Sequence, residues 1–230
     1  MHVGHFAVGF LAKRVEARLS LGTLVLAALL ADFLWCGLML AGVEHVRFKA
    51  GTGAANYAEA YDIALSHSLL TDAVWAALFA AGYFWRRRER RGAWVLFFAV
   101  LSHWPLDVLA HRPDMPLAPG VERYLGLGLW TNVPATVVVE GGFWLLALVL
   151  YARSTRPKKR LGVYAFWAVA ALLTLIWYNN IAGPPPPDPR TAPLFSLVYF
   201  SLVVAWAYWM NRLRPPKSGH ESPDARPPSD

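Results

Sequence analysis

The chain has 230 residues, 56% of them hydrophobic and 16% charged, with 11 tryptophans and a formal net charge of +7. This composition is typical of an integral membrane protein and argues against one or two soluble domains. The single cysteine, Cys36, excludes an intrachain disulfide.

Residues 3–12 form an apolar segment that is too short to cross a membrane and that contains His5. Two placements are open. The segment could be a helix that dips into the bilayer and returns at Lys13, or a short amphipathic helix on the surface. In the first case His5 lies about 13 Å deep and Asp32 about 16 Å deep, at ~1.5 Å per residue. The two side chains would then lie side by side.

Six later apolar stretches approach the length needed to cross a ~30 Å hydrocarbon core; they are 21–43, 63–85, 93–110, 133–152, 161–178 and 194–210. They predict an all-α, polytopic membrane helix bundle with about six transmembrane helices plus the short N-terminal helix. Pro105, in the third stretch, predicts a kink. We expect residues 1–214 to form one integral membrane domain. Residues 215–230, rich in Pro, Ser and charge, should be a disordered cytoplasmic tail.

The basic residues follow the topology of the predicted helices. Most of the 22 fall in four segments that lie on one side of a six-span arrangement, namely 13–18, 86–91, 153–160 and 212–226. The positive-inside rule then predicts a multi-pass protein of a bacterial-type inner membrane with both termini in the cytoplasm. Membrane lipid is the expected partner, and no nucleic-acid binding is expected.

Ionisable side chains inside apolar stretches are costly, and they usually act as ligands or proton relays. His103 and Asp107 are four residues apart, so they share one face of the third predicted helix. His111 continues that face only if the helix persists close to Pro113, which favours a helix end. His111 is therefore either a third ligand or an interfacial loop histidine.

Together with side chains from other stretches, these residues predict a polar layer in the outer half of the membrane. Seven side chains are candidate metal ligands: His5, Asp32, His67, His103, Asp107, His111 and Glu140. Their nitrogen and oxygen donors suit zinc, and also manganese or iron, while no cysteine lies near enough to supply a thiolate. Seven donors exceed one zinc shell. We therefore expect two divalent ions, or one ion with Asp32 or Glu140 as a catalytic acid/base carboxylate.

Each of these residues also has a structural alternative. His103 and Asp107 could form a hydrogen-bonded pair or a proton relay without metal, and His67 could simply bond across helices.

Four short motifs in residues 1–145 carry a resemblance to a known family: His5 with Gly9, Ala31-Asp32, Ser66-His67-Ser68-Leu69-Leu70 and Ser102-His103-Trp104-Pro105-Leu106-Asp107. In order and spacing they resemble the membrane-bound, metal-dependent hydrolases, also described as LexA-binding, inner-membrane-associated hydrolases. Ala31 stands where that family usually has proline.

That family is in turn remotely similar to zinc-dependent phospholipase C, whose His-x-x-x-Asp pair His103 and Asp107 match. The resemblance implies hydrolysis of a phosphodiester or related ester of a lipid-like substrate by metal-activated water. Two other functions stay open. One is an ion or proton-coupled transporter (permease), and the other is a non-catalytic membrane protein with a closed, structural metal site.

Overall fold

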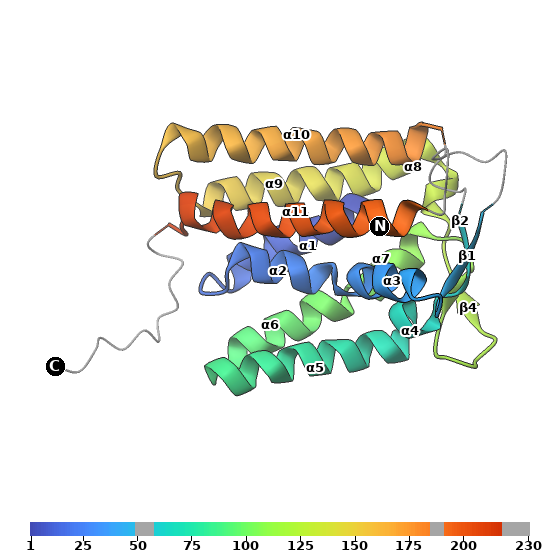
Figure 1. The fold of residues 1–230 in the computed structure, drawn as a ribbon. Helices are drawn as coiled ribbons and strands as arrows, with labels where there is room; N and C mark the ends of the chain where they lie inside the picture. Colours follow the sequence, from blue (N-terminus) through green and yellow to red (C-terminus); the bar gives the residue numbers. More distant parts are fainter. Residues whose placement is uncertain (49–57, 185–190, 218–230) are drawn as a thin grey trace.

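Helices make up most of residues 1–48, 58–184 and 191–217, which are the parts of the chain that the computed structural model describes (Figure 1). They are α1 (His2–Val15), α2 (Leu21–Ala28), α3 (Leu30–Leu40), α4 (Ala64–His67), α5 (Leu69–Arg87), α6 (Arg90–Leu101), α7 (His103–Ala110), α8 (Val133–Thr136), α9 (Gly142–Ser154), α10 (Arg160–Ala182) and α11 (Ala192–Leu213). A 3-10 turn, η2 (Leu129–Thr131), precedes α8, and a π-helical turn, η3 (Val137–Gly141), joins α8 to α9.

Within the described ranges, four helical segments are long and apolar enough to cross a membrane: Arg90–Ala110, Val133–Ser154, Arg160–Ala182 and Ala192–Leu213. The pair α2 and α3 also passes this test, but it is bent by 57°. Helix α5 fills the second predicted stretch but is not among these segments, and it carries Asp72, Arg86 and Arg87. The all-α membrane bundle is thus confirmed, whereas the count of six spans is not.

Short strands occur in two of the connections between the predicted helices. Strand β1 (His45–Phe48) pairs antiparallel with β2 (Ala58–Asp62), and β3 (Met115–Pro116) pairs antiparallel with β4 (Tyr124–Leu125). The strands lie at one end of the bundle, together with α4 and one end of α3 (Figure 1). We call this the strand end of the bundle.

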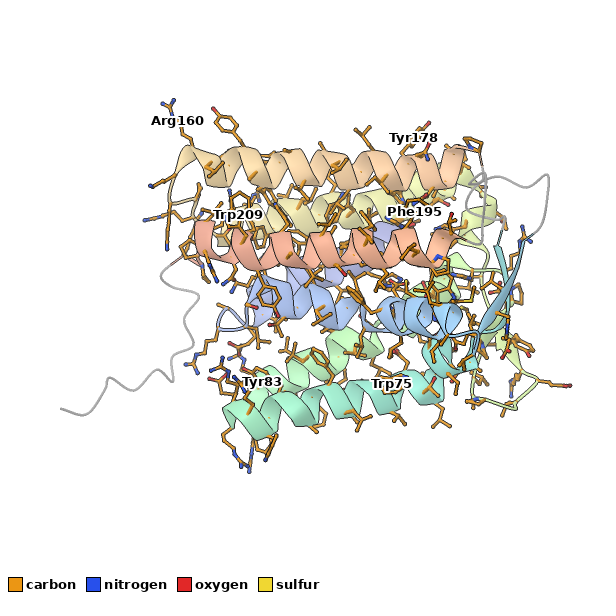
Figure 2. The ribbon with its side chains drawn as sticks, in the orientation of Figure 1. Trp75, Tyr83, Arg160, Tyr178, Phe195 and Trp209 are labelled. Carbon is orange, nitrogen blue, oxygen red and sulfur yellow. The ribbon has the colours of Figure 1, made fainter. Side chains whose placement is uncertain are left out.

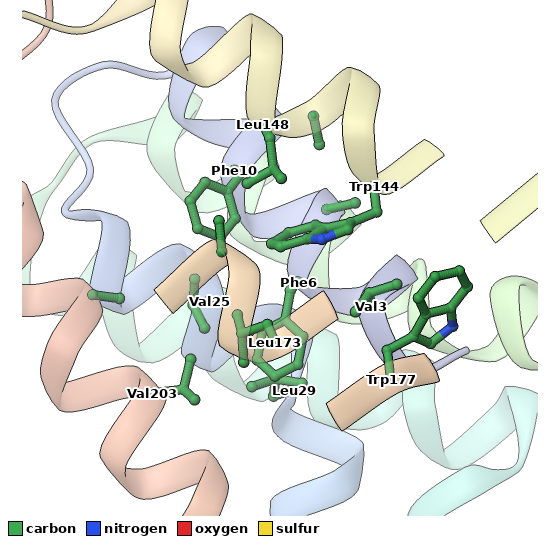
Figure 3. Packing of buried hydrophobic residues seen from close by; sticks show 14 of the residues in the cluster. Val3, Phe6, Phe10, Val25, Leu29, Trp144, Leu148, Leu173, Trp177 and Val203 are labelled. Carbon is green, nitrogen blue, oxygen red and sulfur yellow. The ribbon is translucent and has the colours of Figure 1, made fainter. Parts of the chain in front are cut away.

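The N-terminal helix α1 forms the centre of the hydrophobic core. Val3, Phe6 and Phe10 are essentially inaccessible to solvent. They pack among side chains of α2, α9, α10 and α11, including Trp144, Leu173 and Val203 (Figure 3). Because lipid tails are as apolar as these side chains, close packing rather than water exclusion holds such helices together.

The contact between α1 and α2 is tight because Gly9 has no side chain. A Cβ atom at Gly9 would lie 3.0 Å from the Cα atom of Val25. The turn between the two helices is fixed by Lys13, whose Nζ donates to the carbonyls of Ala17 at 2.7 Å and Leu19 at 2.6 Å. Helices α1 and α2 therefore form a hairpin, which is the chain path that the first of the two placements requires. A surface helix is wrong, because α1 is enclosed by the bundle.

Three of the long apolar stretches are interrupted, and each break lies next to a candidate ligand. Leu29 separates α2 from α3, which carries Asp32. Ser68 has an extended backbone and separates His67 at the end of α4 from α5. Ser102 separates α6 from α7, which begins at His103. Pro105 explains the third break, because it cannot donate to the carbonyl of Leu101.

The segments with the basic clusters lie at the end of the bundle opposite the strands. Tyr83, Arg160 and Trp209 mark this basic end, whereas Tyr178 and Phe195 lie toward the strand end (Figure 2). Many large apolar side chains on the outer faces of α5, α6, α9, α10 and α11 are exposed, as expected for helices that contact lipid.

The first residues of the predicted disordered tail are bonded to the bundle. Pro215 accepts from the backbone N–H of Arg156 at 2.9 Å, and Lys217 donates to the carbonyl of Ser154 at 3.0 Å. These bonds tie residues 215–217 to the turn before α10, and residues 218–230 lie outside the described residues.

Candidate metal centre

Five of the seven predicted ligands converge inside the bundle, from α1, α3, α4 and α7. They form two overlapping groups whose ligand atoms lie within 4.8 Å of one another: His5 with His103 and Asp107, and Asp32 with His67 and His103. His103 belongs to both groups. Its ring stacks on that of His5, with centroids 3.7 Å apart and planes 5° from parallel.

His103 is held so that its Nε2 atom faces the carboxylates. Its Nδ1 lies 3.0 Å from the backbone carbonyl of Ala28, at the end of α2. A carbonyl only accepts hydrogen bonds, so Nδ1 carries the proton and donates it. In the neutral ring Nε2 then has a free lone pair. The break at Leu29 makes this possible, because carbonyls at a helix end lack intrahelical partners.

His67 also directs its Nε2 atom at the carboxylates. Its Nδ1 lies 2.7 Å from Ser66 Oγ, and its Nε2 lies 3.9 Å from both Asp32 Oδ1 and Asp107 Oδ2. The ring of His67 meets the ring of His103 edge-on at 5.1 Å. Two histidines from different helices therefore direct Nε2 at the same pair of carboxylates.

Asp107 occupies the middle of the cluster. Its Oδ2 lies 3.2 Å from His103 Nε2, and its Oδ1 lies 3.0 Å from His5 Nε2. The backbone nitrogen of Met1 also contacts Oδ1 and lies 3.0 Å from His5 Nε2. Met1 is buried in the bundle, so the prediction that both termini lie on the cytoplasmic side is not confirmed.

Asp32 lies at the open side of the cluster. It sits in the first turn of α3, 3.8 Å from His103 Nε2, and its side chain is 20% exposed, against 4% for Asp107. Among the five clustered residues, Asp32 is therefore well placed to meet a molecule that enters from outside.

The donors in this cluster fit a divalent cation. His103 Nε2 is buried and, within the described part of the chain, has no hydrogen-bond partner, because its contact with Asp107 lacks hydrogen-bond geometry. In the neutral ring, a lone pair at Nε2 and a carboxylate oxygen would face each other there, and buried acceptors without a donor are costly. Imidazole nitrogens with carboxylate oxygens are a donor set that zinc, manganese or iron accepts.

His111 lies near the cluster but belongs to neither group. It ends α7, as the following Arg112-Pro113 predicted, and its Nδ1 lies 3.3 Å from Asp114 Oδ1. Its ring packs on Trp130, with centroids 4.9 Å apart. The structure thus gives His111 the loop position, at the wall of the same cavity as the cluster.

Glu140 is also not brought into either group. It is fully buried in the π-helical turn η3. Its Oε1 accepts from the backbone N–H of Gly4 at 3.2 Å, and its Oε2 accepts from Trp130 Nε1 at 3.0 Å. Gly4 lies in the first turn of α1, where N–H groups lack intrahelical partners. Glu140 therefore holds the start of the helix that carries His5.

The sequence reasoning missed Glu44, which lies between α3 and β1. Glu44 is 1% exposed and accepts three hydrogen bonds, from the backbone N–H groups of Leu65 and Ser66 and from Ser66 Oγ. Burial raises the pKa of its carboxyl group, while the bonds from Ser66 and Leu65 oppose that rise. No local pattern in the sequence marks it, because its partners follow some 20 residues later.

A cavity of about 410 Å³ adjoins the cluster and is lined by His5, Asp32, His67 and Asp107. The rest of its wall is mainly apolar, from Trp35, Trp130, Ile176, Ile181, Phe195 and Phe200. A smaller polar part contains His2, whose Nε2 lies 3.2 Å from the hydroxyl of Tyr199. Such a mixture of apolar wall and a few polar groups is typical of small-molecule sites.

Fold and site together define a helical membrane protein with a buried His/Asp cluster beside a cavity. The profile of the YdjM inner membrane protein family matches residues 1–182. The chain therefore belongs to this family, and its membrane location follows. Hydrolase activity and similarity to phospholipase C are not part of that match. No curated protein and no solved structure matches the chain.

Proposed function

We propose that the protein is a membrane-embedded, metal-dependent hydrolase that cleaves a phosphodiester or related ester of a lipid-like substrate. The observation that carries this proposal is the convergence of His and Asp donors at the wall of a largely apolar cavity, with a buried His103 Nε2 that makes no hydrogen bond among the described residues. A structural metal site would have a closed shell, whereas a catalytic one keeps an open position.

The roles of the residues follow from their burial and contacts. His5, His103 and Asp107 would hold the ion, because their ligand atoms lie within 4.8 Å of one another and are shielded from solvent. His67 would add a further ligand, because its Nε2 lies 3.9 Å from Asp107 Oδ2. A bound divalent ion polarises a phosphoryl or carbonyl oxygen and makes water more acidic. Asp32 Oδ1, at the open side, would accept the proton of the attacking water.

The cavity supports an amphiphilic substrate. Phe195, on α11, lines the cavity and is also 70% exposed, which supports an opening of the cavity toward lipid. A lipid could enter sideways there, with its chain against α10 and α11 and its polar group beside Asp32. This geometry would keep an acyl chain out of water while the ester reaches the polar cluster.

Two measurements on the purified protein test this function, its metal content and its hydrolysis of phospholipid. We expect the protein purified in mild detergent to contain zinc, manganese or iron, and to release headgroups from phospholipid in mixed micelles. A chelator should stop the release and added zinc should restore it. Asp32→Asn should slow release by about 100-fold or more. Asp62→Asn, in an exposed pair with His45, is the matched control and should keep the activity.

Two results would contradict the proposal. One is the absence of bound metal in the wild type. The other is a cation flux into proteoliposomes that His103→Ala abolishes, without any metal-dependent hydrolysis. The second result would favour the transporter instead.

We also infer that the basic end of the bundle faces the cytoplasm and the strand end the opposite side. In a Cys36→Ala background, a cysteine at Arg87, in the basic cluster at the end of α5, should react with a membrane-impermeant maleimide only in inverted vesicles. A cysteine at Glu122, exposed between β3 and β4, should react only in intact spheroplasts. The opposite labelling pattern would reverse the orientation.

A further inference from the structure

We infer that Glu44 is a positioning residue of the metal centre, which acts through Ser66 to keep the His67 Nε2 lone pair directed at the ligand cluster. This inference rests on the proposed metal centre and extends it to a residue outside the family motifs. Glu44, Ser66 and His67 form a chain of hydrogen bonds in which each bond decides the direction of the next.

The first bond joins Ser66 to Glu44. Ser66 Oγ lies 2.6 Å from Glu44 Oε2, a distance typical of a hydroxyl that donates to a carboxylate. Glu44 Oε1 accepts from the backbone N–H groups of Ser66 at 2.8 Å and Leu65 at 3.0 Å. Glu44 therefore acts only as an acceptor, and three donors hold it in place.

The second bond joins His67 to Ser66. A serine hydroxyl has one proton, and the proton of Ser66 is directed at Glu44 rather than at the carbonyl of Ile63, 3.4 Å away. At 2.7 Å from His67 Nδ1, Ser66 Oγ can then only accept. His67 Nδ1 thus carries the proton, and the lone pair of the neutral ring is at Nε2.

The direction of this chain matters because Nε2 is the atom that faces Asp32 and Asp107. Outer partners of this kind fix the tautomer and the ring orientation of a metal-binding histidine. The carbonyl of Ala28 does the same for His103. His5 differs, since its Nδ1 has no partner among the described residues.

Glu44→Gln tests the direction of these hydrogen bonds, because glutamine has nearly the size and shape of glutamate but carries donors on one side-chain atom. The glutamine can keep one oxygen on the two backbone N–H groups, but its NH₂ group then donates to Ser66 Oγ. Ser66 would turn its proton toward His67 Nδ1, and the proton of His67 would move to Nε2. We expect the zinc affinity of Glu44→Gln to fall by about 10-fold to 100-fold.

Two further variants separate positioning from packing. Ser66→Ala removes the link and should weaken zinc binding to a similar extent, so it serves if Glu44→Gln does not fold. Ser66→Thr keeps a hydroxyl and should bind zinc nearly as the wild type does.

The affinities are measured in the purified full-length protein by competition with a chromogenic chelator. Cobalt provides a second readout, because loss of a nitrogen ligand weakens and shifts its visible absorption. Thermal unfolding of the metal-free proteins reports on folding. The inference requires a changed cobalt spectrum in Glu44→Gln and a spectrum close to that of the wild type in Ser66→Thr.

Equal zinc affinity of the wild type and Glu44→Gln would overturn this inference and leave the proposed hydrolase intact. An equal loss in Ser66→Thr and Ser66→Ala would also overturn it, because packing would then explain both. If the wild type binds zinc with the help of Glu44 and Ser66 but hydrolyses no lipid, only the proposed hydrolase activity is contradicted.

Discussion

His103→Ala is expected to weaken zinc binding by about 100-fold or more, the largest loss for any single side chain of the centre. His103 belongs to both groups of ligands, so its removal takes a donor from each. Loss of an outer partner of a ligand typically costs about 10-fold to 100-fold in affinity, and loss of a ligand itself should cost at least as much.

Calorimetry or chelator competition measures this loss, and unfolding provides a second measure. Zinc at 100 times its dissociation constant should stabilise the wild type by about 2.7 kcal/mol. The same concentration should stabilise His103→Ala by about 0.4 kcal/mol or less, because a 100-fold weaker site is only half occupied there. His45→Ala is the matched control, because His45 is 52% exposed and outside both groups. An unchanged affinity in His103→Ala would refute the metal centre as described.

Glu140→Ala is expected to lower the free energy of unfolding by about 2 to 4 kcal/mol. Its carboxylate is fully buried and accepts from Gly4 and Trp130, and each donor left without a partner costs about 1–3 kcal/mol. Because Gly4 is next to His5, zinc affinity should also fall, though less than in His103→Ala. Chemical unfolding in detergent measures the first effect. Glu122→Ala, at an exposed glutamate, should change neither quantity.

A second pair of variants distinguishes this structural role from the catalytic role that the sequence also allowed. Glu140→Gln places an NH₂ group against Trp130 Nε1, so two donors face each other. Adding Trp130→Phe removes that conflict and should restore part of the lost stability and zinc affinity. If Glu140 were the catalytic acid or base, Glu140→Gln would instead bind zinc normally and lose turnover, with no rescue by Trp130→Phe.

The helices could be predicted from the sequence to a large extent, because length and apolar composition are local properties. The later apolar stretches are largely helical, and four of the six meet the membrane-spanning criterion as helical segments. The stretch 21–43 meets it only as a pair of helices bent by 57°, and the helix over residues 69–87 does not meet it. Pro105 correctly indicated an interruption nearby. The break at Leu29 has no such signal, since residues 21–40 contain no proline.

The candidate site could be predicted in part. His103 and Asp107 lie on one helix, and their four-residue spacing is enough to bring them together. His5, Asp32 and His67 were also predicted, and the structure brings all of them to that pair. His111 and Glu140 were also predicted as ligands, but they do not belong to the cluster. Their predicted depth could not show this, because the direction of a side chain depends on how its helix is rotated and on what it contacts.

The amino-acid sequence alone determined that this is a helical membrane protein with costly polar groups inside its apolar stretches, and it identified the pair His103 and Asp107. Only the tertiary structure decided that α1 is the centre of the core, that Glu140 holds α1 rather than the cluster, and that Glu44 supports His67. The reason is physical. Hydropathy and helical spacing act within one segment, whereas these three features depend on contacts between segments that are far apart in the chain.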